Sequence, residues 1–248
     1  MSKEWDFYFA RVNDELASLF VDLGIRNSAP DPLRTYLVWC WVYMNQARSD
    51  GLSSASEAPM LGTIEDDVVS SLNGQALFVG RITTAGRREF YFYTEDPPRC
   101  ELAIEHAMGR HAGYRFDLGS KRDSPWSQYL DLLYPSLEDL QRIKNRRTVE
   151  VLEKNGDKLT NARPFSHWAY FARSVDRNAF VLEATRRGFT IVDDSKSTGE
   201  ASPRPYGVTF EKVDSIDKID DVTIELFRLA LLHDGEYDGW ETCVEKSS

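Results

Sequence analysis

The sequence has few cysteines, no long apolar run and a shortage of positive charge. Its three cysteines (Cys40, Cys100 and Cys243) form no C-x-x-C pair, which argues against a disulfide framework or a zinc site and suits a reducing cytoplasm. The longest apolar run, Tyr36 to Met44, has nine residues, whereas a membrane helix needs roughly 20. The start, MSKEWDFYF, lacks the basic and apolar regions of a secretion signal. We therefore expect a cytoplasmic protein without a membrane segment.

Positive charge is scarce, since 30 Lys and Arg stand against 40 Asp and Glu and the formal net charge is −10. Such a chain repels phosphate backbones, so direct binding of nucleic acid is not expected. Residues 206–248 alone hold eleven acidic and four basic side chains, a net charge of −7. Two interpretations stay open for this segment: a solvated surface that maintains solubility, or a docking face for a basic partner.

Catalytic and nucleotide-binding motifs are also missing. The chain contains no G-x-x-x-x-G-K-[ST] loop, no G-x-G-x-x-G after a strand and no local signature of a nucleophile–histidine pair. His106 and His111 are five residues apart and cannot share a helix face as a metal pair would. His167 alternates with Trp168 in an expected strand, which favours a packed or paired ring. We expect no catalytic residue, no metal and no cofactor.

One strand looks at first like a nucleic-acid platform. The stretch GRREFYFY, Gly86 to Tyr93, resembles the aromatic strand with which RNA-recognition motifs stack bases. Arg88 is followed by Glu89 instead of the glycine of that motif, and the run is aromatic on both faces. A core strand is therefore the better interpretation, in agreement with the net charge.

The order β-α-β-β-α-β can be read twice, at about Arg34 to Ser120 and Arg163 to Glu245. An extra β-hairpin, Trp5 to Gly24, precedes the first copy, and a polar loop at 195–205 interrupts the second. This order predicts the α+β class, with two ferredoxin-like sandwiches in tandem, each an antiparallel sheet with two helices on one face.

Pro125 and Pro135 interrupt the pattern between the two copies. We expect an N-terminal α+β domain at 1–122, a linker at 123–160 and a C-terminal domain at 161–248. The linker contains a helix, about 137–154, with a basic cluster formed by Arg142, Lys144, Arg146 and Arg147.

The acidic stretch DGEYDGW, Asp234 to Trp240, matches the calcium-loop template D-x-[DN]-x-[DN]-G-x5-E when Glu245 supplies its last position. The third position holds a glutamate, Glu241 occupies the usually aliphatic eighth position, and three residues after Glu245 leave no room for the second helix. The stretch is therefore predicted to be a helix stop, a bend and a strand start, with Trp240 packed on the core.

The C-terminal half resembles the regulator of ribonuclease E activity B (RraB) family. The similarity lies in FSHWAYF (165–171), EATRRGFTI (183–191) and above all HDGEYDGWET (233–242). The N-terminal half is similar to the bacterial family named domain of unknown function 695, in the stretches WDFYFARV, DGLSSASE and VGRITTAGRREFYFY.

The resemblance implies a ferredoxin-like fold, no catalysis, and binding to the arginine-rich, non-catalytic tail of a ribonuclease, which modulates RNA turnover. We therefore expect a bacterial regulator whose partner is a basic protein segment. The charged docking face is predicted to comprise Asp220, Asp221, Glu225, Asp234, Glu236, Asp238 and Glu241. Two alternatives remain: an enzyme of unrecognised type with a carboxylate and histidine site between the sandwiches, and a small-ligand-binding regulatory module.

Overall fold

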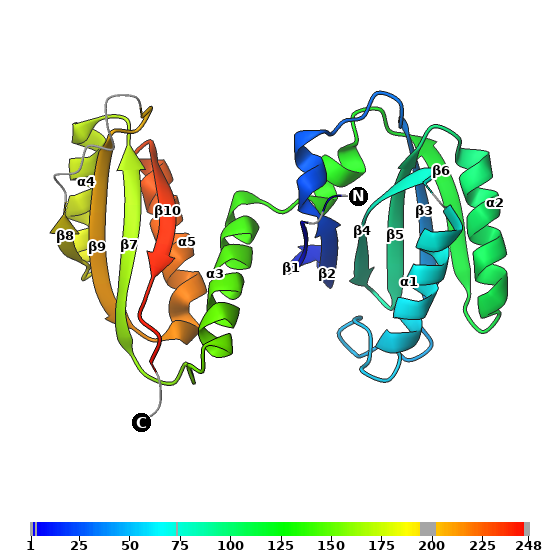
Figure 1. Cartoon of the computed structure of the whole chain (residues 1–248), viewed down its shortest axis with the longest axis horizontal. Helices are drawn as coiled ribbons and strands as arrows, with labels where there is room; N and C mark the ends of the chain where they lie inside the picture. The colour runs from blue at the N-terminus through cyan, green and yellow to red at the C-terminus, as the bar shows by residue number, and fades with distance from the viewer. Residues whose placement is uncertain (1, 3, 73, 194–201, 246–248) are drawn as a thin grey trace. The chain divides into compact units, whose positions relative to one another are not determined.

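The computed structural model describes residues 2, 4–72, 74–193 and 202–245, and the chain divides into two compact units between Pro135 and Ser136 (Figure 1). Each unit combines helices with its own antiparallel sheet, of six strands in the first unit and four in the second, as far as the described residues go. The predicted α+β class is confirmed. Of the polar loop expected at 195–205, residues 195–201 lie outside the described part.

The sheet of the first unit has the strand order β1-β2-β4-β5-β3-β6, and all neighbouring strands are antiparallel. The strands are β1 (Trp5–Val12), β2 (Glu15–Asp22), β3 (Tyr36–Tyr43), β4 (Ala76–Thr84), β5 (Arg87–Thr94) and β6 (Phe116–Arg122). Helices α1 (Ala58–Leu72) and α2 (Pro97–Met108) lie on one face of this sheet (Figure 1). Leu61 of α1, Ile104 of α2 and Phe92 of β5 belong to the core that joins the helices to the sheet.

The extra N-terminal hairpin is present as β1 and β2. Asn13 and Asp14 have φ of 51° and 66° in its two-residue turn, which is the backbone geometry that matches the twist of paired strands. The hairpin joins the sheet through β2 and β4. The hairpin expected around Ala85 and Gly86 is confirmed too, with φ of 46° and 75° at these residues.

The segment expected to be a linker at 123–160 is divided between the two units. Its first part packs on the sheet of the first unit, where Trp126 is 1% exposed and stacks on Tyr93 with ring centroids 4.0 Å apart. The indole of Trp126 donates to the carbonyl of Arg34 (2.8 Å), and the hydroxyl of Tyr129 donates to the carbonyl of Asp22 (2.7 Å). Because these large rings bury their apolar faces and satisfy their polar tips, this part of the segment is core and not linker.

The sheet of the second unit has the order β10-β7-β9-β8 and is antiparallel throughout. Its strands are β7 (Arg163–Phe171), β8 (Thr190–Asp193), β9 (Tyr206–Asp214) and β10 (Gly235–Glu241). Helices α4 (Ser174–Arg186) and α5 (Ile219–Leu232) lie behind the strands in the view of Figure 1. Phe180 of α4, Leu226 of α5 and Phe210 of β9 meet in the core between these layers.

The second part of the expected linker is α3 (Leu137–Lys154), which packs on α5 within the second unit. Asn145 is 1% exposed and donates to Asp220 and Thr223, at 2.7 Å each. Its side-chain oxygen accepts from Gln141 (2.9 Å) and Trp240 (2.8 Å). An amide side chain has four hydrogen-bonding positions, and Asn145 fills all of them with partners from its own helix, α5 and β10.

The basic cluster of α3 forms ion pairs with acidic residues of the same helix. Arg142 lies 2.9 Å from a carboxylate oxygen of Asp139, and Arg146 lies 3.5 Å from Glu150. Pairs three or four residues apart on a helix stabilise it modestly. Part of the cluster therefore supports the helix itself.

Candidate functional site

The predicted docking residues of α5 take part in contacts inside the second unit. Asp220 accepts the hydrogen bond from the buried amide of Asn145. Glu225 accepts from the guanidinium of Arg187 at 2.7 Å, and Arg187 also binds Glu183 at 2.8 Å. A carboxylate with an internal cation has less charge left for a partner. Of the three residues predicted on α5, Asp221 keeps the most of its charge for an external group.

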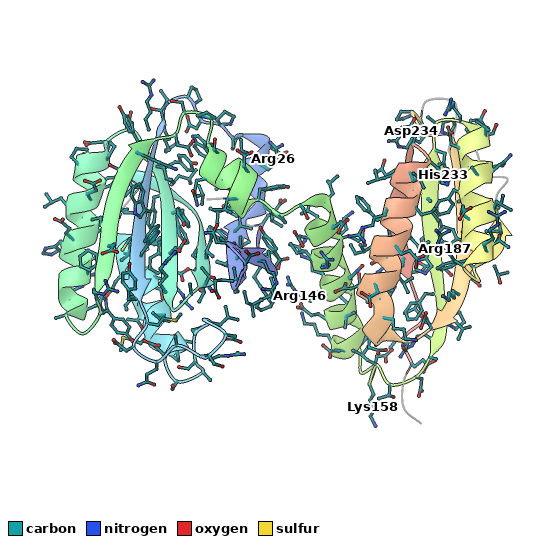
Figure 2. All side chains as sticks on the ribbon, turned by 180° about the vertical axis from the view of Figure 1, so that it is seen from behind. Arg26, Arg146, Lys158, Arg187, His233 and Asp234 are labelled. Atoms are coloured by element: carbon teal, nitrogen blue, oxygen red, sulfur yellow. The ribbon has the colours of Figure 1, made fainter. Side chains whose placement is uncertain are left out.

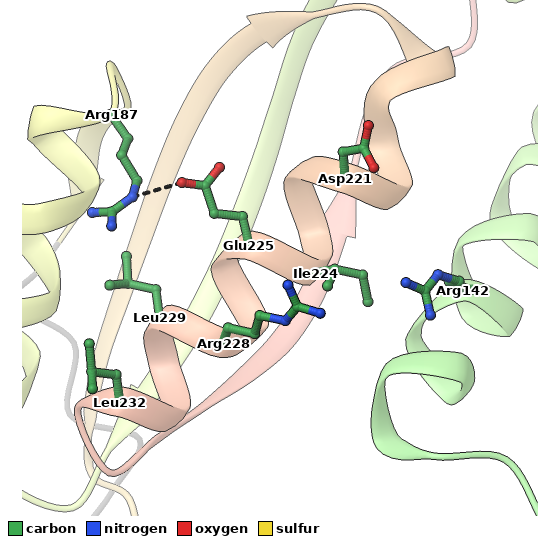
Figure 3. A pocket seen from close by; sticks show the side chains of 8 residues that line it. All are labelled: Arg142, Arg187, Asp221, Ile224, Glu225, Arg228, Leu229 and Leu232. Atoms are coloured by element: carbon green, nitrogen blue, oxygen red, sulfur yellow. Dashed lines mark hydrogen bonds and ion pairs between the residues drawn. The ribbon is translucent and has the colours of Figure 1, made fainter.

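Asp221 and Glu225 line a groove of about 370 Å³ along α5 (Figure 3). Residues from α3, α4's C-terminal end and α5 line it: Arg142, Arg187, Asp221, Ile224, Glu225, Arg228, Leu229 and Leu232. Arg228 binds both carboxylate oxygens of Glu138, at 2.7 and 2.8 Å, and this bond holds the pKa of Glu138 below its ordinary value. The rim thus carries charges of both signs, most of which already pair with one another.

The other four predicted residues belong to the turn after α5 and to β10. Asp234 lies beyond the end of α5, next to His233, with φ of 53° (Figure 2). The following Gly235 pairs with Phe171 in the ladder, and a Cβ atom there would overlap the Phe171 ring. The sequence DG is therefore required locally: Asp234 tolerates the left-handed turn and Gly235 leaves room for the ring.

Glu236, Asp238 and Glu241 are exposed on β10, and a β-bulge interrupts the ladder between Tyr237 and Gly239. Tyr237 is buried in the core against the helices. Because successive side chains of a strand point to opposite faces, Glu236 lies on the face of the sheet away from α4 and α5. The guanidinium of Arg204 contacts it at 3.4 Å.

The seven predicted residues therefore do not form one surface. Those of α5 lie in the helical layer, around the groove and the Asn145 network. Glu236 and Glu241 lie on the opposite, open face of the sheet, because their ladder partners Tyr170 and Ser166 alternate with buried residues of β7. A charge count along the chain does not distinguish these two faces.

Three residues of the open face are absent from the predicted set. Trp168 and Tyr170 of β7 are half-buried there, and Glu211 of β9 accepts a hydrogen bond from Ser166 at 2.8 Å. The signal is present in FSHWAYF, where Phe165, His167, Ala169 and Phe171 are buried and the residues between them are not. This alternation of buried and partly exposed residues predicts from the sequence that Trp168 and Tyr170 lie on the open face.

His167 is a structural residue of the core. It is 1% exposed, stacks on Phe210 with centroids 5.5 Å apart, and shares a 2.9 Å hydrogen bond with the hydroxyl of Tyr237. Burial, with a smaller contribution from the charge of Lys212, lowers the pKa of His167 to about 4. The ring is therefore neutral near pH 7.

The calcium-loop residues lie apart in the structure. Glu245 accepts from the side chain of Asn161 at 2.9 Å and lies 4.0 Å from Arg163, at the end of β10 opposite to Asp234. Within the described ranges, no group of three or more His, Cys, Asp or Glu side chains is placed to hold a metal ion. Nor is any helix in those ranges long and apolar enough to cross a membrane.

In comparisons with known proteins, the two halves of the chain match the models of different families. The model of the family of unknown function DUF695 matches residues 3–134, and the model of the regulator of ribonuclease activity B matches residues 142–242. Both resemblances expected from the sequence are confirmed. A search of curated proteins finds no match.

Among solved structures, the crystal structure of an unknown protein from Galdieria sulphuraria is 11% identical. The match covers 85% of this chain and 99% of that one, with a TM-score of 0.23, which supports no conclusion about fold or function. The family models are thus the informative comparison: the chain belongs to the DUF695 family, and its second unit carries a match to the regulator of ribonuclease activity B.

Proposed function

We propose that this protein is a non-catalytic regulator that binds the basic, non-catalytic tail of a ribonuclease E-type endoribonuclease and thereby modulates RNA turnover in a bacterial cytoplasm. The observation that carries the proposal is the match of residues 142–242 to the regulator of ribonuclease activity B. That match indicates a regulatory protein that acts through a protein partner. The first unit, which belongs to a family of unknown function, has no assigned part in this proposal.

Electrostatics supports a basic partner. The chain carries a net charge of −10, and Glu236, Asp238 and Glu241 are exposed on one strand of the second unit. Complementary charge accelerates encounter and discourages binding of acidic partners, RNA included. The four predicted residues of the turn and β10 are the principal docking residues. Asp220 and Glu225 contribute less because of their internal contacts, and Asp221 contributes from the groove of α5.

Each unit is further proposed to be a ferredoxin-like sandwich, the fold that the family resemblance implies. The second unit supports this with the element order β7-α4-β8-β9-α5-β10 and the strand order β10-β7-β9-β8. The first unit has the same arrangement in β6-β3-β5-β4, with β2 and β1 added beyond β4. In both sheets the last strand of the repeat lies beside the first, and the third lies between the first and the second.

The proposal is tested with the full-length chain and the isolated ribonuclease tail. Titration calorimetry at increasing salt should show an affinity that falls steeply with ionic strength, because exposed charges are screened. Reversal of Asp234, Glu236 and Asp238 to lysine should abolish most of the binding. Reversal that leaves the affinity unchanged, together with binding insensitive to salt, would contradict the electrostatic mechanism.

A functional readout completes the test. The endoribonuclease, with and without its tail, is assayed on a model RNA in the presence of the protein. The proposal expects a change of cleavage rate with the tailed enzyme and none with the tailless enzyme. Equal effects on both enzymes would show that the tail is not the partner.

A further inference from the structure

The open face of the second sheet presents two aromatic rings beside carboxylates. Trp168 and Tyr170 project from β7 on the side away from α4 and α5, since Ala169 between them and Phe171 after them are buried in the core. Figure 1 shows the four strands in front of the two helices, and no described element of this unit covers that side of the sheet. Trp168 and Tyr170 are half-buried, so part of each side chain is accessible.

The surroundings of the two rings are acidic. Glu236 is the ladder partner of Tyr170, and Glu241 is the ladder partner of Ser166, two residues from Trp168. Glu211 lies opposite Ser166 on the other side of β7. Burial raises the pKa of Tyr170, and the charge of Asp238 raises it further. Carboxylates thus flank the row of Trp168 and Tyr170 from both neighbouring strands.

A cationic planar group fits this surface best. Guanidinium groups stack on aromatic faces and bind carboxylates with two parallel hydrogen bonds, whereas an ammonium group has no face to stack. Stacked arginines occur elsewhere in this protein, since Arg87 lies 4.5 Å from the ring centroid of Trp41. In the described part of the chain, neither Trp168 nor Tyr170 has a cation over its ring.

The spacing of the rings sets the spacing of the ligand. Trp168 and Tyr170 are two residues apart on one strand, so their positions are separated by roughly 6.5–7 Å. Arginines at positions i and i+2 of an extended peptide have the same separation. An extended segment laid along β7 can therefore place one guanidinium on each ring, with the acidic side chains at its edges.

We propose that the open face formed by Trp168, Tyr170, Glu211, Glu236 and Glu241 binds an extended protein segment with arginines at alternate positions, R-x-R. The inference rests on the proposed function for the existence of a basic partner. It adds the surface, the conformation of the partner and a preference for arginine over lysine.

The test uses the full-length protein and fluorescently labelled peptides of equal length and charge that carry R-x-R, K-x-K or adjacent R-R pairs in a Gly/Ser background. Wild-type protein should bind R-x-R at least about threefold more tightly than either other peptide, given the size of exposed cation–π contacts. The double variant Trp168→Leu/Tyr170→Leu should bind R-x-R roughly five- to twentyfold more weakly and lose the preference. Equal binding of the three peptides by wild-type protein would overturn the proposal.

Matched variants separate rings from charge and from folding. Trp168→Phe/Tyr170→Phe keeps two rings and should keep the preference for R-x-R, with an unchanged melting temperature. Glu236→Gln/Glu241→Gln should weaken the binding of all three peptides alike, whereas Asp221→Asn/Glu225→Gln removes the same charge from the groove of α5 and should weaken their binding less. Weakening by the α5 pair alone would place the ligand in the groove and refute the open-face site.

A second titration, with the ribonuclease tail, distinguishes this inference from the function on which it rests. Tail binding that survives Trp168→Leu/Tyr170→Leu refutes the surface and leaves the proposed function standing. Ring-dependent R-x-R binding without any tail binding supports the surface and refutes the proposed partner. Single-stranded RNA is included as a competitor, and ring-dependent binding of RNA in place of R-x-R would overturn the proposal.

Discussion

The indole of Trp240 donates a 2.8 Å hydrogen bond to the side-chain oxygen of Asn145, 95 residues earlier in the chain. This bond joins the acidic motif after α5 to a helix that was expected to be a linker. It is one of the contacts that make α3 part of the second unit. Trp240 is confirmed as a packing residue, with its ring 5.5 Å from that of Phe165.

Replacement of Asn145 by leucine should destabilise the second unit by about 2–4 kcal/mol, because buried polar partners on three elements lose their hydrogen bonds. Urea unfolding monitored by tryptophan fluorescence measures the effect. Lys144→Ala, on the exposed side of the same helix, is the control and should change stability by less than about 0.5 kcal/mol. An unchanged free energy of unfolding in Asn145→Leu would show that packing alone holds α3 in place.

The second unit should lose stability in mild acid because of His167. The pKa of His167 in the folded state is about 4, below its ordinary value of 6.5. The stability that depends on its neutral ring is therefore fully present above pH 6.5. That contribution, at most about 3 kcal/mol, is lost as the pH falls from 6.5 toward 4. Urea midpoints of wild type and His167→Gln, compared at pH 7.5 and 5, should show a smaller pH dependence in the variant.

The exposed His106 provides the comparison for that experiment. His106→Gln should leave the pH dependence of the wild type intact. If both variants retain it, the acid sensitivity arises from carboxylates and not from the buried ring.

Fragments that end on either side of residues 123–135 should behave differently. A fragment 1–135 should fold and unfold cooperatively, because it retains Trp126 and Tyr129, both buried. A fragment 1–122 exposes the surface that these rings cover and should be unstable, since loss of one such ring costs about 3–5 kcal/mol. Circular dichroism and dye binding compare the two fragments. Equal stability would show that the N-terminal domain ends at residue 122, as the sequence predicts.

Gly235→Ala should destabilise the second unit by about 1–3 kcal/mol, because the added Cβ overlaps the Phe171 ring in a packed core. Gly62→Ala is the matched control. Gly62 lies in α1 with open space around its Cα, and alanine there should stabilise the first unit by up to about 1 kcal/mol. Thermal melting of both variants measures the difference, and a neutral Gly235→Ala would mean that Phe171 can move.

The order of helices and strands could be predicted from the sequence because their signals are local. The apolar positions Leu61, Ile64, Val68 and Leu72 have helical spacing and are all buried in α1. The packing of 123–135 does not follow from local signals, because its two prolines indicate a break whereas the burial of Trp126 depends on Tyr93, 33 residues earlier. Tertiary packing outweighed the local signal there.

The sequence predicts which acidic residues the candidate site contains, but not how they are arranged in space. A count of charges finds the acidic segment, but the partners that engage Asp220 and Glu225, namely Asn145 and Arg187, come from distant parts of the chain. The alternation around His167 contains the missing information about Trp168 and Tyr170. Both faces of a strand have to be assigned before exposed aromatic residues can be recognised.

The bulge in β10 shifts the phase of the strand by one residue. Tyr237 and Trp240 are three residues apart, and in a regular strand side chains with that spacing would point to opposite faces. With the bulge, both face the helices, and Trp240 reaches Asn145. The bulge is therefore as strongly constrained as the composition of DGEYDGW, because regular pairing of the same residues would turn the indole toward the open face of the sheet and Glu241 toward the helices.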